Sequence, residues 1–111
     1  RELMKIEETD HRAKQAVQLF CYQTRKWIGS FAAVLNGLDI LVFAGGIGEH
    51  SPEVRSKVCD NLAFLGIELD EINNMNNEYL ISTEMSKVKV YVIKTNEELM
   101  IAKLVSNLLN H

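Results

Sequence analysis

The residues with the strongest chemical signal follow a short apolar run in the middle of the chain. Residues 45–50 read Gly-Gly-Ile-Gly-Glu-His and come directly after Leu38–Ala44. Glycine permits positive φ angles and a close approach of a ligand to main-chain N–H groups. The helix start predicted at Ser51-Pro52 adds partial positive charge that suits an anion. Neither a Walker lysine nor the GxGxxG pattern is present, so two interpretations stay open: a nucleotide or phosphate loop, and a tight strand-to-helix turn without a ligand.

A second candidate is the run Thr95-Asn96-Glu97-Glu98, which follows a predicted buried strand. Thr95 and Glu98 form a capping box, in which each side chain accepts a hydrogen bond from an orphan backbone N–H. Glu97 is then left without a structural role. In a parallel sheet it would lie at the ligand-binding edge and face the glycine loop, where a carboxylate suits Mg²⁺. The alternative is a solvated glutamate that stabilises the helix dipole.

The remaining polar and sulfur side chains fit structural roles better than catalytic ones. His50 borders the glycine loop and could contact a ligand, but one histidine does not define a reaction. Ser51 is predicted to cap a helix, since no His/Asp partner is placed for it. Cys21 and Cys59 form no zinc pattern and are expected to be reduced core residues. Solvated positions are expected for His11, His111, Asn73, Asn74, Asn76 and Asn77, and core or interface positions for Trp27 and Phe31.

These candidates need a frame of helices and strands to position them. Apolar residues at intervals of three and four predict a long helix that Asp10 caps. Buried strands are predicted at Leu38–Ala44 and Val88–Ile93, with a helix between them that runs from Ser51 to a stop at Gly66. Weaker signals indicate a short helix before residue 10, a stop at Asn36-Gly37, brief strands at 67–69 and 80–83, a loop or short polar helix at 70–77, and a terminal helix after Thr95.

The alternation of helices and strands predicts an α/β fold with a parallel sheet. Two strands do not make a stable sheet by themselves. We therefore expect the weak segments to pair, or further strands to come from other sequence or a second copy. A length of 111 residues fits one domain, but the low strand count and the N-terminal Arg predict a segment of a domain.

Composition excludes several classes of function. The net charge is −3 and the isoelectric point about 5.6, so the chain lacks the basic face that nucleic-acid binding requires. No apolar run approaches the ~18–20 residues of a membrane helix. The mixed, polar first five residues resemble neither a signal peptide nor a transit peptide. We expect a cytoplasmic protein without nucleic-acid or membrane partners.

Three separated blocks of sequence resemble the C-terminal part of the acetate kinase family in order and spacing. They are Tyr22–Phe43, Gly46–Glu49 and Ile81–Leu99. Propionate and butyrate kinases share the pattern. The resemblance implies that residues 1–111 are part of a C-terminal nucleotide-binding domain with the RNase H-like fold of the acetate and sugar kinases and actin, without its first antiparallel strands. It also implies an ATP-dependent kinase that reversibly phosphorylates acetate to acetyl phosphate.

The resemblance further implies roles for individual residues. The nucleotide-contacting glycine loop of the family corresponds to Gly46, Ile47, Gly48, Glu49 and His50. Glu97 corresponds to the Mg²⁺-associated glutamate. Arg1 corresponds, with a one-residue gap and without the preceding aspartate, to an arginine that contacts adenosine. The implied ligands are ATP or ADP, Mg²⁺ and acetate. The family's acetate-binding and phosphoryl-stabilising residues lie upstream, so this chain supplies no catalytic residue and is expected to be inactive alone.

Three positions depart from the family pattern. Ala44 stands two residues before Gly46 where the family has a hydroxyl residue, His50 replaces an asparagine at the end of the loop, and Lys94 replaces a proline. The first two could alter nucleotide affinity, whereas Lys94 is expected to be neutral. Family members resemble one another in dimerising through this domain, so we expect a homodimer. The alternative function is a non-catalytic nucleotide-binding or dimerisation module.

Overall fold

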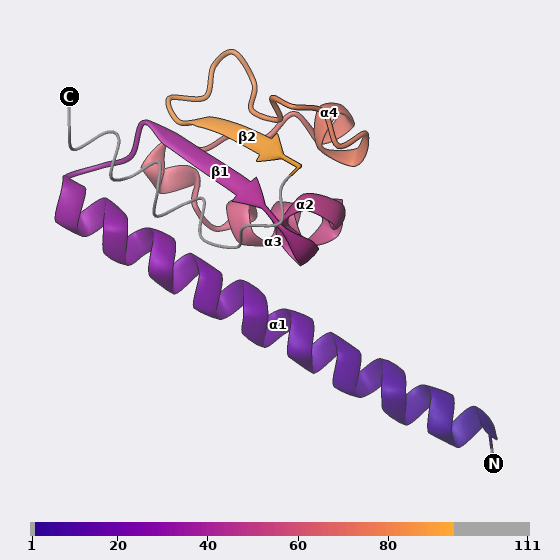
Figure 1. Cartoon of the computed structure of the whole chain (residues 1–111). Helices are drawn as coiled ribbons and strands as arrows, with labels where there is room; N and C mark the ends of the chain where they lie inside the picture. The colour runs from indigo at the N-terminus through magenta and orange to yellow at the C-terminus, as the bar shows by residue number, and fades with distance from the viewer. Residues whose placement is uncertain (1, 95–111) are drawn as a thin grey trace.

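The computed structural model of the chain describes residues 2–94, with side-chain surroundings given from residue 10 onward except at residue 47. One long helix lies along a small body of strands and short helices (Figure 1). The elements in order are α1 (Glu2–Leu35), β1 (Ile40–Ala44), α2 (Gly46–His50), α3 (Pro52–Asp60), the 3₁₀ turn η1 (Ala63–Leu65), α4 (Glu71–Met75) and β2 (Lys89–Ile93). The terminal helix predicted after Thr95 lies outside the described residues.

The two predicted buried strands form the sheet and are parallel, as the sequence indicated. Ile40 pairs with Lys89 and Ala44 with Ile93, so both strands end at the same edge. The three central residues of β1 are all buried, which explains its continuous apolar run. In β2, buried and half-buried residues alternate. This edge of the sheet is the one at which the glycine-containing segment follows β1.

The weaker extended segments pair as expected, although only through isolated bridges. Leu80 bridges antiparallel to Tyr91 in β2, and Leu69 bridges antiparallel to Ser82. The backbone N–H of Ile81 donates to the carbonyl of Val90 at 2.9 Å. These contacts extend the two-stranded sheet on the β2 side without adding a full strand among residues 2–94.

Helix α1 differs from the prediction at its start and in its buried face. It begins at Glu2 and runs for 34 residues, so Asp10 is an exposed interior residue and not an N-cap. The prediction was wrong because no residue before Asp10 breaks a helix. Trp27 is 64% exposed, and from residue 10 onward the buried residues of α1 are Cys21, Ile28 and Ala32. The predicted stop is confirmed, since Asn36 and Gly37 follow the last helical residue with positive φ.

The helix after β1 starts as predicted and ends earlier. The Ser51 hydroxyl accepts a hydrogen bond from the N–H of Val54, and Pro52 occupies the first turn. The helix ends at Asp60 instead of reaching Gly66. Gly66 caps η1 with a φ of 92°, and a Cβ there would lie 2.8 Å from the Cβ of Lys87. Glycine is required at this position by both backbone conformation and close packing.

Both cysteines are buried and unpaired, as predicted. They lie in the main hydrophobic cluster, which joins α1, α3 and both strands. Its buried members are Cys21, Ile28, Leu41, Phe43, Val54, Val58, Cys59, Leu62, Ile67, Ile81, Val88, Val90 and Val92. This cluster holds α3 and the end of β1 in fixed relation to each other.

Candidate functional site

The candidate site begins where β1 ends. The chain leaves Ala44 through Gly45 (φ 68°) and Gly46 (φ 44°), two consecutive residues in the left-handed region. Residues other than glycine rarely adopt that backbone conformation. Apart from its chain neighbours and its own helix, a Cβ built on Gly46 would meet no atom of residues 2–94 within 4 Å, so among these residues the backbone here is open to a ligand. The sequence correctly predicted a sharp glycine turn at this edge of the sheet.

The predicted loop is a single helical turn. Residues Gly46–His50 form α2, and the N–H of Glu49 donates to the carbonyl of Gly45 at 3.3 Å. The sequence did not predict this helix because glycine, which disfavours helices, occupies three of the five positions from 45 to 49. Contacts with the surrounding protein therefore decide its conformation.

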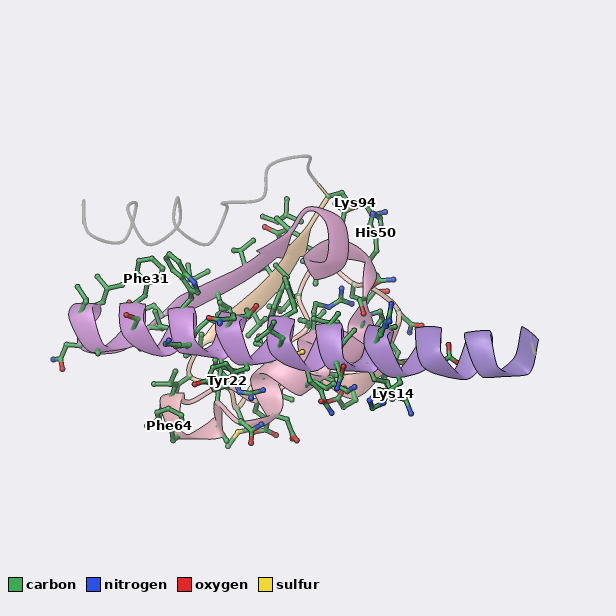
Figure 2. All side chains as sticks on the ribbon, turned by 90° about the horizontal axis from the view of Figure 1, so that it is seen from below. Lys14, Tyr22, Phe31, His50, Phe64 and Lys94 are labelled. Carbon is green, nitrogen blue, oxygen red and sulfur yellow. The ribbon has the colours of Figure 1, made fainter. Side chains whose placement is uncertain are left out.

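The five predicted nucleotide-contacting residues all lie in this turn. Gly46 is exposed, Gly48 is half-buried, and the backbone of Ile47 lies between them. The Glu49 side chain is only 11% exposed, whereas that of His50 is 74% exposed, and Nε2 of His50 lies 3.3 Å from Oε2 of Glu49. Figure 2 shows His50 and Lys94 at the same end of the molecule, where the two strands end. The turn thus presents an open backbone next to a histidine–carboxylate pair.

Two predicted site residues lie outside the described residues. They are Arg1, assigned to adenosine, and Glu97, assigned to Mg²⁺. The capping box of Thr95 and Glu98 lies outside them as well. What the structure does describe is Lys94, three residues before Glu97 in sequence, at the edge of the sheet that carries α2.

An arginine that the sequence analysis overlooked lies directly behind the turn. Arg55 in α3 is fully buried, with 0% of its surface exposed. Its Nη1 donates to the carbonyl oxygens of Gly48 and Glu49, each at 3.0 Å. Arg55 therefore holds the carboxyl end of α2 against α3.

The other side of the guanidinium is bonded to the segment around α4. Nε of Arg55 donates to Oδ1 of Asn74 at 2.7 Å, and Nη2 donates to the Asn74 carbonyl at 2.8 Å and to Oδ1 of Asn77. A guanidinium has five N–H donors, and here they meet five oxygen acceptors. The complete set of hydrogen bonds is what permits a buried charge that none of these acceptors neutralises.

Asn74 is the matching residue on the other side of this network. The sequence predicted a solvated run of asparagines, but Asn74 is fully buried, so the prediction was wrong for this residue. Its Nδ2 donates to the Pro52 carbonyl at 2.9 Å, while its Oδ1 accepts from Arg55. A side chain with one acceptor and one donor in fixed positions fits both partners. The expectation of solvent exposure holds at Asn76 and Asn77.

Burial shifts two ionisation equilibria in α3. Desolvation lowers the pKa of Arg55, and the negative charge that Cys59 can carry acts in the opposite direction. Desolvation raises the pKa of Cys59 to about 12; Glu71 adds to that rise and Arg55 opposes it. Arginine keeps its charge at neutral pH in proteins, and Cys59 is a protonated thiol. Cys59 therefore has none of the thiolate character that a nucleophile needs.

Hydrophobic periodicity gives no signal for Arg55. The apolar stripe of α3 is Val54 and Val58, with Leu62 continuing the spacing just beyond its end, and a charged residue next to such a stripe is normally solvated. The pairing depends on Asn74, nineteen residues later, and a single sequence does not reveal which polar residues meet in space. Only the unusual number of asparagines between residues 73 and 77 hinted at a polar structural role.

Neither a metal-binding cluster nor a membrane-spanning helix is found in the part of the chain that the structure describes. Within residues 2–94 no group of three or more His, Cys, Asp or Glu side chains is arranged to hold a metal. None of the described helices is both long enough and apolar enough to cross a membrane. The candidate site among these residues is therefore the glycine turn with its supporting arginine.

Comparison with known proteins gives a consistent result. A model of the acetokinase family matches residues 1–103. The acetate kinase of Coprothermobacter proteolyticus is 54% identical over 95 residues, which are 85% of this chain and 24% of that enzyme. The matched region is the C-terminal part of these kinases. The chain thus spans about a quarter of the length of the curated relatives it matches.

Solved structures extend the comparison to the fold. Porphyromonas gingivalis acetate kinase matches with a TM-score of 0.74 and 38% identity, over 94% of this chain and 27% of that one. A propionate kinase from Francisella tularensis subsp. tularensis matches with a TM-score of 0.68 and 41% identity, over 86% of this chain and 24% of that one. Since the family match covers nearly the whole chain and the relatives share about half of the aligned residues, the chain belongs to the acetokinase family.

Proposed function

We propose that this chain supplies the nucleotide-phosphate and Mg²⁺ part of a carboxylate kinase that transfers the γ-phosphoryl group of ATP reversibly to acetate. The proposal assigns nucleotide contacts to Gly46, Ile47, Gly48, Glu49 and His50. It assigns an adenosine contact to Arg1 and the Mg²⁺-associated carboxylate to Glu97. The parent domain is RNase H-like, and residues 1–111 are its C-terminal portion. The observation that carries the proposal is an open glycine turn at the shared edge of two parallel strands, in a member of the acetokinase family.

The residues present fit a polyphosphate ligand at this turn. Among residues 2–94, no atom outside the local backbone lies within 4 Å of a Cβ position on Gly46, which leaves room for a phosphate oxygen to approach the main chain. The exposed imidazole of His50 lies beside the turn and can donate a hydrogen bond to an anion. Mg²⁺ binds through one or two carboxylates together with substrate phosphates, so a single glutamate, Glu97, suffices from this chain.

Phosphoryl transfer depends on positioning and on stabilising charge at the equatorial oxygens. In this proposal the turn orients the nucleotide phosphates and Glu97 orients the metal. The groups that bind acetate and stabilise the transferring phosphoryl belong to the rest of the enzyme, so the 111-residue chain alone should produce no acetyl hydroxamate from acetate and ATP. Acetate is the proposed acceptor, and propionate or butyrate is the alternative within the same chemistry.

Calorimetric titration of the 111-residue chain with Mg·ATP tests the assignment of Glu97. We expect measurable heat of binding that Glu97→Ala weakens at least tenfold. Glu98→Ala is the matched control, because the capping role leaves its side chain on the backbone of the same helical turn. Equal losses in both variants would reject Glu97 as the metal-associated residue. No heat at millimolar nucleotide would favour the alternative of a non-catalytic dimerisation module.

One observation favours association as a second role. Helix α1 carries several large side chains that are mostly exposed: Leu19, Phe20, Tyr22, Trp27 and Val34. Contiguous exposed apolar surface often marks a protein interface. We infer a homodimer that uses this helix. We also infer a cytoplasmic location, because both buried cysteines are unpaired thiols.

A further inference from the structure

The glycine turn is too short and too rich in glycine to hold its own shape. Helix α2 has five residues, and isolated helices far longer than this are marginal in water. The hydrogen bond that joins it to the preceding residue, from the Glu49 N–H to the Gly45 carbonyl, is long at 3.3 Å. The position of residues 46–50 must therefore be fixed by contacts from elsewhere in the fold.

Arg55 supplies two hydrogen bonds between the turn and helix α3. Its Nη1 lies 3.0 Å from both the Gly48 and the Glu49 carbonyl oxygens. These carbonyls form the negative end of α2, and a buried cation bonded to them compensates that charge. The same contacts turn the carbonyl oxygens toward the protein interior, so they do not oppose a negatively charged ligand at the turn.

The guanidinium is itself held in place by α4. Asn74 accepts two of its hydrogen bonds, through Oδ1 and through the main-chain carbonyl, and Asn77 accepts a third. Asn74 is anchored in turn by the bond from its Nδ2 to the Pro52 carbonyl. The series of hydrogen bonds from α4 through Arg55 to α2 is continuous and buried. It leaves no unpaired donor on the guanidinium.

We propose that Arg55, fixed by Asn74, is the positioning residue of the glycine turn. It holds α2 in the conformation that receives the nucleotide phosphates without touching the nucleotide. The ligand part of this inference rests on the proposed function, whereas the positioning part does not. Lysine cannot replace Arg55, because a single ammonium group cannot bond to α2 and α4 in the planar, forked geometry that the guanidinium uses.

The decisive variant is Arg55→Lys, which keeps the charge and removes the fork. Two controls accompany it. Arg25→Lys changes another arginine that donates to a carbonyl of α3, that of Lys57, but has no contact with α2. Val58→Ala removes buried volume from the same helix and lowers overall stability. If Arg55→Lys does not fold, Asn77→Gly removes one acceptor at the surface and tolerates the positive φ of that residue.

Hydrogen exchange measures the positioning without any ligand. In Arg55→Lys we expect the amides of residues 46–50 to exchange at least tenfold faster, with β1 and β2 changed much less. Val58→Ala should raise exchange throughout the chain without singling out the turn, and Arg25→Lys should leave the turn unchanged. Exchange in residues 46–50 that rises no more than exchange in the strands would overturn the proposal.

Titration with Mg·ATP then connects the turn to the nucleotide. We expect Arg55→Lys to raise the dissociation constant about tenfold, while Val58→Ala keeps it within about twofold. Equal weakening in the two variants would show that lost stability, and not lost positioning, is responsible, and would overturn the proposal. If the unchanged chain binds no nucleotide but Arg55→Lys loosens the turn selectively, the proposed function fails for the isolated chain while the positioning role of Arg55 stands.

Discussion

Asn74 shows how one amide side chain can decide the stability of a polar core. Its side chain bridges the Arg55 guanidinium and the Pro52 carbonyl, and all three groups are removed from water or nearly so. Replacement of Asn74 by leucine, which has a similar volume, leaves donors of a buried cation and one carbonyl without partners. Loss of one partner of a buried charge is costly, whereas exchange of both for apolar groups need not be.

We therefore expect Asn74→Leu to lower the free energy of unfolding by about 3 kcal/mol, measured by urea denaturation. Asn76→Ala serves as the control, since Asn76 is exposed and a surface change of this kind costs within ~0.5 kcal/mol. Similar losses in the two variants would mean that the buried network contributes little.

Cys59 makes stability depend on pH in the alkaline range. Burial raises the pKa of its thiol from 9.0 to about 12, with Glu71 adding to the rise and Arg55 opposing it. Below pH 9 the thiol is protonated in both the folded and the unfolded chain, and its contribution is fully present. Between pH 9 and about pH 12, only the unfolded chain loses the thiol proton of Cys59. The free energy of unfolding therefore falls as pH rises, by at most ~1.4 kcal/mol per pH unit.

Urea denaturation at pH 7.5 and pH 10.5 tests this dependence. Other groups titrate in the same interval, so the comparison is with Cys59→Ala, which retains them. We expect the free energy of unfolding to fall less steeply with pH in the variant than in the unchanged chain. Parallel declines would contradict the shift assigned to Cys59.

For individual residues, the sequence predicted those roles that depend on near neighbours in the chain. It missed the roles that depend on partners far away in the sequence. Ser51 was correctly predicted to cap α3, because the cap bonds to an N–H only three residues away. Arg55 and Asn74 are nineteen residues apart, and each looks like a solvated residue when viewed alone. Their pairing is a property of the folded chain that no local pattern encodes.

Helices and strands were predicted well where the spacing of apolar residues and the length of the segment indicate the same structure. Their ends were predicted less well. Both strands were predicted from runs of apolar and β-branched residues, and their parallel pairing followed from the order of elements. The helix that begins at Pro52 was predicted too long, since Leu62 and Leu65 continue its apolar spacing into η1. Its C-cap, Asn61, has none of the left-handed geometry of a glycine stop, so no residue type marks the earlier end of the helix.

Two of the predicted cap residues, Ser51 and Asp10, serve as a matched pair. Ser51 caps α3, whereas Asp10 lies inside α1 and is exposed. We expect Ser51→Ala to lower the free energy of unfolding by about 1 kcal/mol. Asp10→Ala should leave stability unchanged or slightly higher, because alanine favours a helix interior more than aspartate does. Urea denaturation of both variants measures the difference. A loss of about 1 kcal/mol at Asp10 would mean that the helix begins there after all.

The whole molecule combines a small buried core with one helix that lies partly beyond it. The amino-terminal part of α1 extends past the sheet (Figure 1). Farther along α1, three exposed side chains are aromatic: Phe20, Tyr22 and Trp27. A chain that leaves such surface in water gains stability when a second copy covers it. This favours self-association as the state in which the 111-residue chain is most stable.

Thermal unfolding over a hundredfold range of chain concentration tests the association. Because dimerisation stabilises the folded state by mass action, we expect the melting temperature to rise with concentration. Trp27→Asp should remove most of that dependence, since it places a charge in the exposed apolar surface of α1, where Trp27 is 64% exposed. Asn76→Asp introduces the same charge at an exposed polar position outside α1 and should preserve the dependence. A melting temperature independent of concentration would reject the homodimer, and loss of the dependence in both variants would assign it to charge instead of the apolar surface.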